Sequence, residues 1–243
     1  MQALILAGGL GERLRSIVND RPKPMAHIGE KPFLEYQLEF LKRQGVNHLV
    51  LCVGYRHRQI QEYFGSGEHW GVHIDYSVEA ELLGTAGAIK QAHQYITGRF
   101  LALNGDTFFG LDLGAFIKFH ELDKLMRQRY IASIALARVR EAGSYGLVLL
   151  DDNDHVLQFL EKQQSSADDN AGSKWVNAGI YILEPEILDH IPGGKKVSIE
   201  RDIFPALLEA GFVLGGYQAQ GAFIDIGTPD GYYRFQTHIL GRK

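Results

Sequence analysis

Short apolar runs alternate with amphipathic segments through the first half of the chain. The apolar runs cover residues 2–7, 48–53, 73–78 and 99–104, and the helical patterns cover residues 33–44, 56–64 and 86–96. This alternation is typical of βαβ units, in which crossover helices cover a mostly parallel sheet. We therefore predict an α/β fold whose first half is Rossmann-like, with helices flanking the sheet.

The pattern changes after residue 130. Further strand-like runs follow at residues 131–139, 145–150, 155–160 and 175–183. The first three have short connections, which favours antiparallel strands added to the same sheet over another βαβ unit. The polar stretch 163–173 is expected to be a mobile surface loop, because the strand patterns on both sides of it need one sheet. We predict one domain over residues 1–243, with its two halves meeting near residue 130.

Composition narrows the class of protein. Of the 243 residues, 45% are hydrophobic and 22% charged, as in an ordinary soluble globular protein, and no apolar run approaches the roughly 20 residues that span a bilayer. The net charge of −4 gives no basic field for nucleic acid. We therefore expect neither a membrane nor a nucleic acid as partner.

The first apolar run has no basic residue before it, which indicates a strand and not a signal peptide. The single cysteine, Cys52, lies within an apolar run, so we expect a buried thiol and a reducing, cytoplasmic location.

A glycine-rich turn follows the first strand. It reads Gly8-Gly9-Leu10-Gly11-Glu12-Arg13, and Lys23 comes ten residues later between two prolines. Glycines after a strand let backbone N–H groups approach phosphates, while Arg13 and Lys23 offer charge to a polyphosphate. By itself such a turn is as consistent with a tight strand-to-helix connection, and it matches neither the Walker A loop nor the dinucleotide fingerprint.

Together with Arg13 and Pro22-Lys23-Pro24, this turn closely resembles the signature of the nucleotide-sugar pyrophosphorylases, the sugar-1-phosphate nucleotidyltransferases. Five more motifs follow in the family's order: Leu83-Gly84-Thr85-Ala86-Gly87-Ala88, Leu103-Asn104-Gly105-Asp106, Glu161-Lys162, Val176-Asn177-Ala178-Gly179-Ile180-Tyr181 and Ile224-Asp225-Ile226-Gly227-Thr228-Pro229. Within the family, the chain is most similar to the bacterial D-glycero-α-D-manno-heptose 1-phosphate guanylyltransferases.

The resemblance implies an enzyme that transfers a nucleoside monophosphate from an NTP to a sugar 1-phosphate and releases pyrophosphate. GTP and the heptose 1-phosphate are the expected substrates. A uridylyltransferase for N-acetylmuramate 1-phosphate and a guanylyltransferase for mannose 1-phosphate are the alternatives within the family. Residues 1–130 are then mainly the NTP-binding half, and residues 131–243 mainly the sugar-phosphate-binding half.

The family positions imply a set of nucleotide-binding residues: Leu6, Gly8, Gly9, Gly11, Arg13, Lys23, Glu79, Gly84 and Thr85. Glu79 falls at the nucleobase. One carboxylate can accept both adjacent donors of guanine, N1–H and N2–H₂, whereas uracil and thymine present one donor flanked by acceptors. This favours GTP, although Glu79 as a solvated loop charge is equally consistent with the sequence.

Two aspartates are candidates for binding a metal. Asp106 follows an apolar strand, at the sheet edge where open α/β folds bind ligands, and Asp225 is a lone carboxylate in an apolar segment, where its charge needs a cation or donors. Taken singly, either could be a cap or turn residue. In the resembling family the two positions hold Mg²⁺, in keeping with its preference for carboxylates and phosphate oxygens. Arg13, Lys23, Asp106 and Asp225 are therefore the expected catalytic residues.

The acceptor needs no general base, because a sugar 1-phosphate is already an oxyanion at neutral pH. The enzyme has to align two anions and neutralise their repulsion. The resemblance implies that Glu161 and Lys162 face the sugar phosphate and that Tyr145, Gly146, Asn177 and Gly179 contact the sugar. An exposed ion pair at Glu161-Lys162 and core packing of Tyr145 are the simpler alternatives.

Other classes of protein fit the sequence less well. A glycosyltransferase would usually carry Asp-x-Asp where this chain has Asn104-Gly105-Asp106, and a regulatory subunit that has lost the chemistry would not need the intact set of charged residues. The ten histidines have no His-x-His or His-Glu-x-x-His spacing, so no zinc site is expected. The chain ends soon after Asp225, which predicts a stand-alone transferase, and the aromatic segment 231–235 is expected to pack a terminal helix on the core or on a partner in a homodimer.

Overall fold

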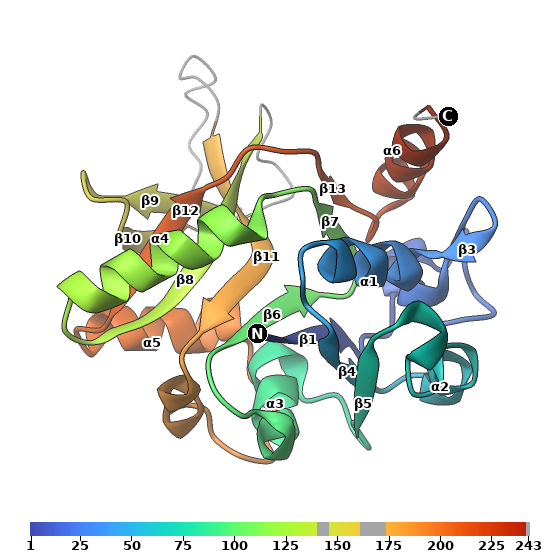
Figure 1. Cartoon of the computed structure of the whole chain (residues 1–243), viewed down its shortest axis with the longest axis horizontal. Helices are drawn as coiled ribbons and strands as arrows, with labels where there is room; N and C mark the ends of the chain where they lie inside the picture. The colour runs from blue at the N-terminus through green and yellow to red at the C-terminus, as the bar shows by residue number, and fades with distance from the viewer. Residues whose placement is uncertain (140–145, 161–173, 242–243) are drawn as a thin grey trace.

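A nine-stranded sheet forms the centre of the computed structural model, which describes residues 1–139, 146–160 and 174–241 (Figure 1). Four strands in its first half are parallel: β6 (Phe100–Asn104), β1 (Gln2–Ala7), β4 (His48–Val53) and β5 (His73–Val78), in that spatial order. Helices α1 (Phe33–Arg43), α2 (His57–Phe64) and α3 (Gly84–Gln91) make the crossovers. The predicted Rossmann-like first half is confirmed, and only the helix expected at 86–96 differs, because it begins at Gly84 and passes into a 3₁₀ turn, Ala92–Tyr95.

The second half adds antiparallel strands to the same sheet, as predicted. They are β8 (Tyr130–Val139), β9 (Leu147–Leu150), β10 (Val156–Leu160) and β11 (Lys174–Leu183). Strand β11 pairs with β6, β8 and β9, and so joins the parallel and antiparallel parts without a break. The predicted surface loop at 163–173 lies outside the described residues.

Several elements were not expected from the sequence. Strand β12 (Val213–Gln218) pairs parallel to β8, and its Gly215-Gly216 lowers its strand propensity. Helix α4 (Leu113–Met126) is capped by Asp112, which accepts from Ala115 N at 3.0 Å, but it leaves large apolar side chains near its end exposed.

The remaining elements are short, apart from the terminal helix. The strands are β2 (His27–Ile28), β3 (Lys31–Pro32), β7 (Thr107–Phe109) and β13 (Phe223–Asp225), and the helices are α5 (Phe204–Glu209) and α6 (Pro229–Leu240). There are also 3₁₀ turns at Glu12–Leu14, Lys23–Met25, Glu68–Trp70 and Pro185–His190, and a π-helical turn at Ile199–Ile203.

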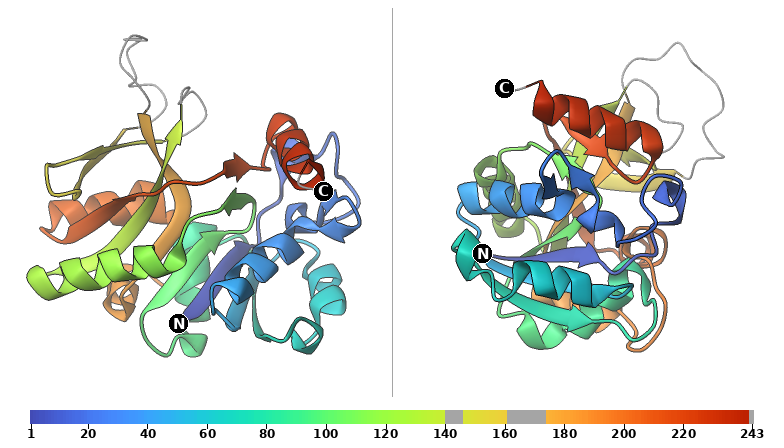
Figure 2. Two further views of the ribbon diagram at one scale, coloured as in Figure 1. Left: turned by 45° about the horizontal axis from the view of Figure 1, so that its top comes forward. Right: turned by 90° about the vertical axis from the view of Figure 1, so that its right-hand side faces the viewer.

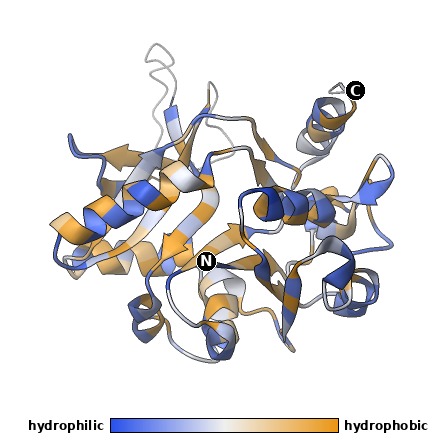
Figure 3. Ribbon diagram, viewed as in Figure 1, coloured by the Kyte–Doolittle hydropathy of each residue, from blue (hydrophilic) through white to orange (hydrophobic). Residues whose placement is uncertain are grey.

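Helices cover both faces of the sheet (Figure 2). Side chains of α1, α2 and α4 pack on one face, and those of α3 and α5 pack on the other. The hydropathy view follows this arrangement, since the middle strands are largely hydrophobic whereas the helices carry both colours (Figure 3). Cys52 is buried as predicted, in the layer beneath α3. Among the helices of the described residues, none has the length and apolar character to cross a membrane.

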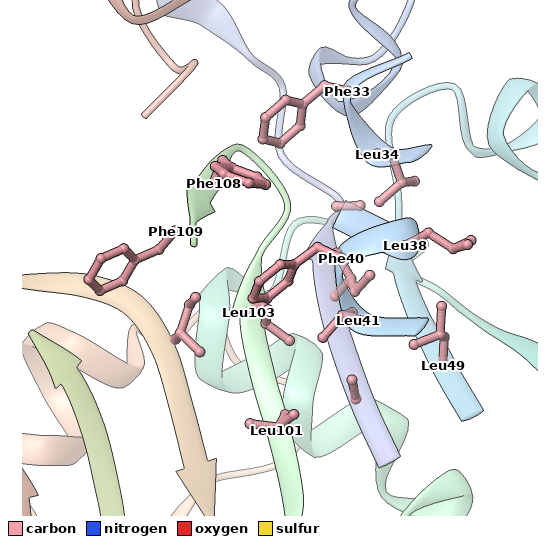
Figure 4. Close-up of a cluster of buried hydrophobic side chains, with 14 of the residues drawn as sticks. Phe33, Leu34, Leu38, Phe40, Leu41, Leu49, Leu101, Leu103, Phe108 and Phe109 are labelled. Atoms are coloured by element: carbon pink, nitrogen blue, oxygen red, sulfur yellow. The ribbon is translucent and has the colours of Figure 1, made fainter. Parts of the chain in front are cut away.

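The terminal helix packs on the core of its own chain. The ring of Phe235 in α6 is fully buried and lies 5.0 Å from Phe33 and 5.1 Å from Phe108, measured between ring centroids. Figure 4 shows Phe33 and Phe108 at one end of the aromatic and aliphatic cluster that also contains Phe40 and Leu103. Helix α6 is therefore held against β7, the strand that directly follows the turn carrying Asp106.

Candidate functional site

A cavity of about 320 Å³ opens at the carboxyl ends of the parallel strands. Every nucleotide-binding residue expected from the sequence except Arg13 lines it, from β1 and the turns that follow it, from the turn after β5 and from the start of α3: Leu6, Gly8, Gly9, Gly11, Lys23, Glu79, Gly84 and Thr85. Asp106, one of the two predicted metal ligands, lines it from the turn after β6. This is where ligands bind in open α/β sheets. Below, this space is called the first cavity.

A short two-stranded ladder sets Asp106 beside Asp225. Strands β7 and β13 pair so that Asp225 is opposite Thr107, and Ile226 N donates to the carbonyl of Asp106 at 2.9 Å. The two aspartates are 119 positions apart in the sequence. The ladder therefore accounts for how two separate motifs reach one site.

Both aspartates meet the predicted cations. Lys23 Nζ donates to Asp106 Oδ2 at 2.7 Å, and Arg13 Nη2 lies 3.8 Å from Asp225 Oδ2. Burial raises the pKa of Asp225, and the negative charge of Asp106 raises it further, while Gly227 N–H at 2.6 Å opposes the shift. A divalent cation would offset both the cost of burying the Asp225 charge and the repulsion between the two carboxylates. The donor set therefore fits the metal implied by the sequence.

Gln37 holds the turn that carries Asp106, a role that was not predicted from the sequence. Its Nε2 donates to the carbonyls of Asn104 at 2.9 Å and Thr107 at 2.7 Å, one on each side of Asp106. Gln37 is buried within the apolar face of α1. A polar residue on an otherwise apolar helix face was the only available signal.

Glu79 is buried and is not a solvated loop charge. Its Oε2 accepts from Leu83 N at 3.0 Å, and its Oε1 lies so close to the backbone of Gly8 that a Cβ there would collide with it. Burial raises the pKa of the Glu79 carboxyl. The structure thus places a carboxylate in the wall of the first cavity, against the glycine turn.

A second, larger cavity of about 1100 Å³ adjoins the first. Gly84, Thr85, Asn104 and Lys196 line both cavities. Of the predicted sugar-binding residues, Gly146, Asn177 and Gly179 line the second cavity, and Arg13 lines it too. Tyr145, Glu161 and Lys162 lie outside the described residues.

A hydrogen-bond network around Glu200 connects the walls of the two cavities. Its Oε2 accepts from Thr85 Oγ1 at 2.8 Å and from Ser198 Oγ at 2.7 Å, and its Oε1 accepts from Tyr181 OH at 3.0 Å. Asn177 Nδ2 donates to Tyr181 OH at 3.0 Å. Glu200 lies in the π-helical turn, a rare element that is frequent at functional sites. Its segment, Ser198-Ile199-Glu200-Arg201-Asp202, mixes apolar and charged residues without a motif, so nothing distinguished it in the sequence.

Two glycines allow these walls to come together. Gly84 has φ +71°, and a Cβ there would lie 2.5 Å from the carbonyl oxygen of Val197. Gly179 has φ +68° in the irregular part of β11, and a Cβ there would collide with the side chain of Asn104. Positive φ and close approach both require glycine. Substitution at Gly84 would push its turn away from Val197, and substitution at Gly179 would displace the side chain of Asn104.

Comparison with known proteins identifies the protein family. The model of the family described as nucleotidyl transferase matches residues 2–242. The chain belongs to this family. It is a nucleotidyltransferase, and the resemblance inferred from the motifs is confirmed.

The chain is similar over its whole length to members of this family. It is 39% identical to D-glycero-alpha-D-manno-heptose 1-phosphate guanylyltransferase of Campylobacter jejuni, with 97% of this chain and 98% of that protein covered. It is 38% identical to the protein of the same name from Aneurinibacillus thermoaerophilus, with 98% of each covered. The crystal structure of HddC from Yersinia pseudotuberculosis complexed with GMP-PN has a TM-score of 0.81 and 34% identity, covering 98% of this chain and 99% of that one.

The geometry suits the chemistry of a nucleotidyltransferase. Two anionic substrates need adjoining sites with cations at the junction, and the junction here has Lys196 in both walls, with Lys23 in the first cavity and Arg13 in the second. Members of this family generally use a divalent metal, which agrees with the paired carboxylates.

Proposed function

We propose that the protein transfers GMP from GTP to D-glycero-α-D-manno-heptose 1-phosphate and releases pyrophosphate. The observation that carries the proposal is the pair of adjoining cavities with Gly84, Thr85, Asn104 and Lys196 in their shared wall. Support for the particular substrates comes from the full-length similarity to two proteins with this activity in their names, and to a structure complexed with GMP-PN.

The first cavity is proposed as the GTP site. Gly8, Gly9 and Gly11 would offer backbone N–H groups to the triphosphate, with Lys23 as a countercharge. Glu79 would accept from N1–H and N2–H₂ of guanine with its carboxylate. Leu6, Gly84 and Thr85 complete the proposed wall around the nucleoside.

Asp106 and Asp225 are proposed to hold Mg²⁺. When bound, the ion would neutralise negative charge on the reacting phosphates. The paired carboxylates support this choice, because Mg²⁺ prefers one or two carboxylates together with phosphate oxygens and water. Lys23 and Arg13 would add fixed positive charge beside the same two carboxylates.

The second cavity is proposed as the site of the sugar 1-phosphate. A phosphate oxygen of this substrate forms the new bond to the α-phosphorus of GTP, while the bond from that phosphorus to the bridging oxygen breaks and its electron pair leaves with pyrophosphate. Asn177 and Gly179 would contact the sugar, beside Gly146, and Lys196 would bind phosphate at the junction. Tyr145, Glu161 and Lys162 remain predictions for the same substrate.

The test is a substrate panel. Pyrophosphate release is measured with GTP, UTP, dTTP, CTP and ATP against the 1-phosphates of the heptose, mannose, glucose and N-acetylmuramate. We expect the highest kcat/KM with GTP and the heptose 1-phosphate. A preference for a pyrimidine nucleotide would overturn the base assignment, and a preference for mannose 1-phosphate would overturn the sugar assignment, while either would leave the transferase chemistry intact.

A further inference from the structure

Two histidines and an aspartate converge at the opposite end of the parallel strands from the two cavities. His48 begins β4, His73 begins β5, and the two are register partners on adjacent strands. Asp75 follows His73 by two positions, so its side chain lies on the same face of β5. His48 Nε2 lies 2.8 Å from Asp75 Oδ2, and His73 Nε2 lies 3.3 Å from the same oxygen.

We propose that His48, His73 and Asp75 form a binding site for a divalent transition-metal ion such as Zn²⁺. One ligand atom from each of the three lies within 4.8 Å of the others. A tetrahedral site with metal–ligand bonds of about 2.1 Å has neighbouring ligand atoms about 3.4 Å apart. The separation between His73 Nε2 and Asp75 Oδ2 matches that value, whereas His48 Nε2 is hydrogen-bonded to the same oxygen at 2.8 Å and would exchange this hydrogen bond for a bond to the ion.

The ligand types determine which metals fit. Two imidazoles and a carboxylate suit Zn²⁺, Ni²⁺ or Cu²⁺, whereas Mg²⁺ and Ca²⁺ prefer oxygen ligands alone. This donor set therefore differs from the paired carboxylates of Asp106 and Asp225. The side chains of His48, His73 and Asp75 are 38%, 64% and 28% exposed, which leaves water free to supply the remaining ligand.

The position in the fold indicates what the ion would do. Strand β5 is the last strand at its side of the sheet (Figure 1), and the ion would tie its first residues to β4. An edge strand lacks the second neighbour that holds the inner strands. Glu79 follows the other end of β5, about 20 Å away along the strand. The ion would therefore stabilise the strand that leads to Glu79 without touching either cavity.

The sequence could not show this site, because its spacing is not local. His48 and His73 are 25 residues apart, and only the parallel register of β4 and β5 brings them together. The expectation that the histidines form no zinc site rested on local spacing alone.

The test is Zn²⁺ binding by isothermal titration calorimetry with excess Mg²⁺ present, in an Asp225→Asn background that weakens competition from the other carboxylate pair. We expect about one Zn²⁺ per chain at micromolar concentration, and a melting temperature that rises with Zn²⁺. His73→Ala and Asp75→Asn should each weaken binding by about 10- to 100-fold or more, since even loss of a residue behind a ligand has an effect of this size.

His93→Ala is the matched control, because His93 is an exposed histidine on the neighbouring 3₁₀ turn. It should leave Zn²⁺ binding unchanged. His73→Ala in an otherwise native chain, assayed with Mg²⁺, should leave nucleotidyl transfer unchanged. No Zn²⁺ binding at these concentrations, or equal binding by the native trio and by His73→Ala with both proteins folded, would overturn the proposal.

Discussion

Carboxylates at the proposed site and away from it have opposite electrostatic surroundings in this protein. Glu184, away from the site, accepts from Arg99 Nε at 2.6 Å and lies 2.9 Å from His120 Nε2. Burial alone would raise its pKa, but these hydrogen bonds and charges lower it. Asp225 and Glu79, at the site, have raised pKa values, because burial outweighs the backbone N–H that each accepts, and at Asp225 the negative charge of Asp106 raises the pKa further.

The opposite pKa shifts distinguish a carboxylate that stabilises the fold, Glu184, from carboxylates available to bind a ligand, Asp225 and Glu79. A carboxylate compensated by its own protein has little to gain from a substrate or a metal, whereas one left under-compensated binds a cation or a donor favourably. Asp225 and Glu79 therefore reduce the stability of the ligand-free protein and favour its complexes. Substitutions that remove each charge test this contrast directly.

The largest expected effect is the loss of turnover in Asp225→Asn. The amide keeps the shape of the side chain but removes a proposed metal ligand, so kcat should fall at least about 1000-fold, equivalent to about 4 kcal/mol. The melting temperature in EDTA should not fall, because the substitution also removes an under-compensated charge. EDTA should stop the native enzyme and Mg²⁺ should restore it.

Asp230→Asn is the control for this variant, since Asp230 is exposed in the first turn of α6. It should have native activity. Turnover near the native value in Asp225→Asn, measured by pyrophosphate release, would contradict the assignment of Asp225 to the metal. Asp106→Asn should behave like Asp225→Asn.

Arg13→Ala should have the next largest effect on turnover. If the guanidinium acts on charge that develops on the leaving pyrophosphate, kcat should fall by about 2 to 4 kcal/mol, or roughly 30- to 1000-fold, with little change in the KM of the sugar phosphate. Arg15→Ala removes a nearby exposed charge and should leave both constants unchanged. A change confined to the sugar-phosphate KM would assign Arg13 to the acceptor, whose proposed cavity it lines.

Glu184→Gln tests the compensated side of the comparison. It removes the charge that His120 and Arg99 contact, and it should destabilise the fold by about 2 to 3 kcal/mol, less than for a wholly buried pair because Arg99 keeps contact with water. For a protein of this size the melting temperature should fall by roughly 4 to 12 °C. Calorimetry should show no comparable change in Glu186→Gln, an exposed residue two positions away. If Glu184→Gln were as stable as the native protein, Glu184 would not be a fold-stabilising carboxylate, and its contrast with Asp225 and Glu79 would not hold.

The sequence predicted the parts of the site that are local in the chain. The glycine turn and the apolar strands each lie within about ten residues, so period and spacing were sufficient to find them. The parallel and antiparallel halves of the fold were predicted for the same reason. Asp106 and Asp225 were each singled out by their place in an apolar segment, but the family motifs were needed to assign both to one metal, since the β7–β13 ladder that joins them was not expected.

The supports of the site could not be predicted, because they depend on contacts between distant segments. Gln37 reaches Asn104 across 67 positions, and Glu200 reaches Thr85 across 115. Neither side chain belongs to a pattern of its own in the sequence. Strand β12 was missed for a different reason, because its two adjacent glycines lower its strand propensity and its partner β8 is more than 70 residues away.

The smallest expected effect is that of Glu79→Gln, which bears on the choice of base. The amide offers one acceptor and one donor where guanine presents two donors, so the preference for GTP over UTP in kcat/KM should fall. The loss should be about 1 to 2 kcal/mol, the lower part of the range for a bidentate base contact, because Glu79 Oε2 already accepts from Leu83 N. Glu81→Gln changes an exposed glutamate of the same turn and should keep the native preference.

The pH dependence of Glu79 gives this prediction a second measurement. Burial raises its pKa in the folded protein above the ordinary value near 4.5. The folded state therefore binds the proton more tightly than the unfolded state, and this contribution to stability is present below pH 4.5 and is lost as pH rises through the raised pKa. Above that pH, Glu79→Gln should melt higher than the native protein, by no more than about 2 to 4 °C, the shift that about 1 kcal/mol produces at this size. The preference of the native enzyme for GTP should decline as pH falls through the same raised pKa, because a protonated carboxyl no longer accepts from both guanine donors. If Glu79→Gln melts lower than the native protein at neutral pH but prefers GTP over UTP as strongly as the native enzyme does, Glu79 belongs with Glu184 among the carboxylates that stabilise the fold.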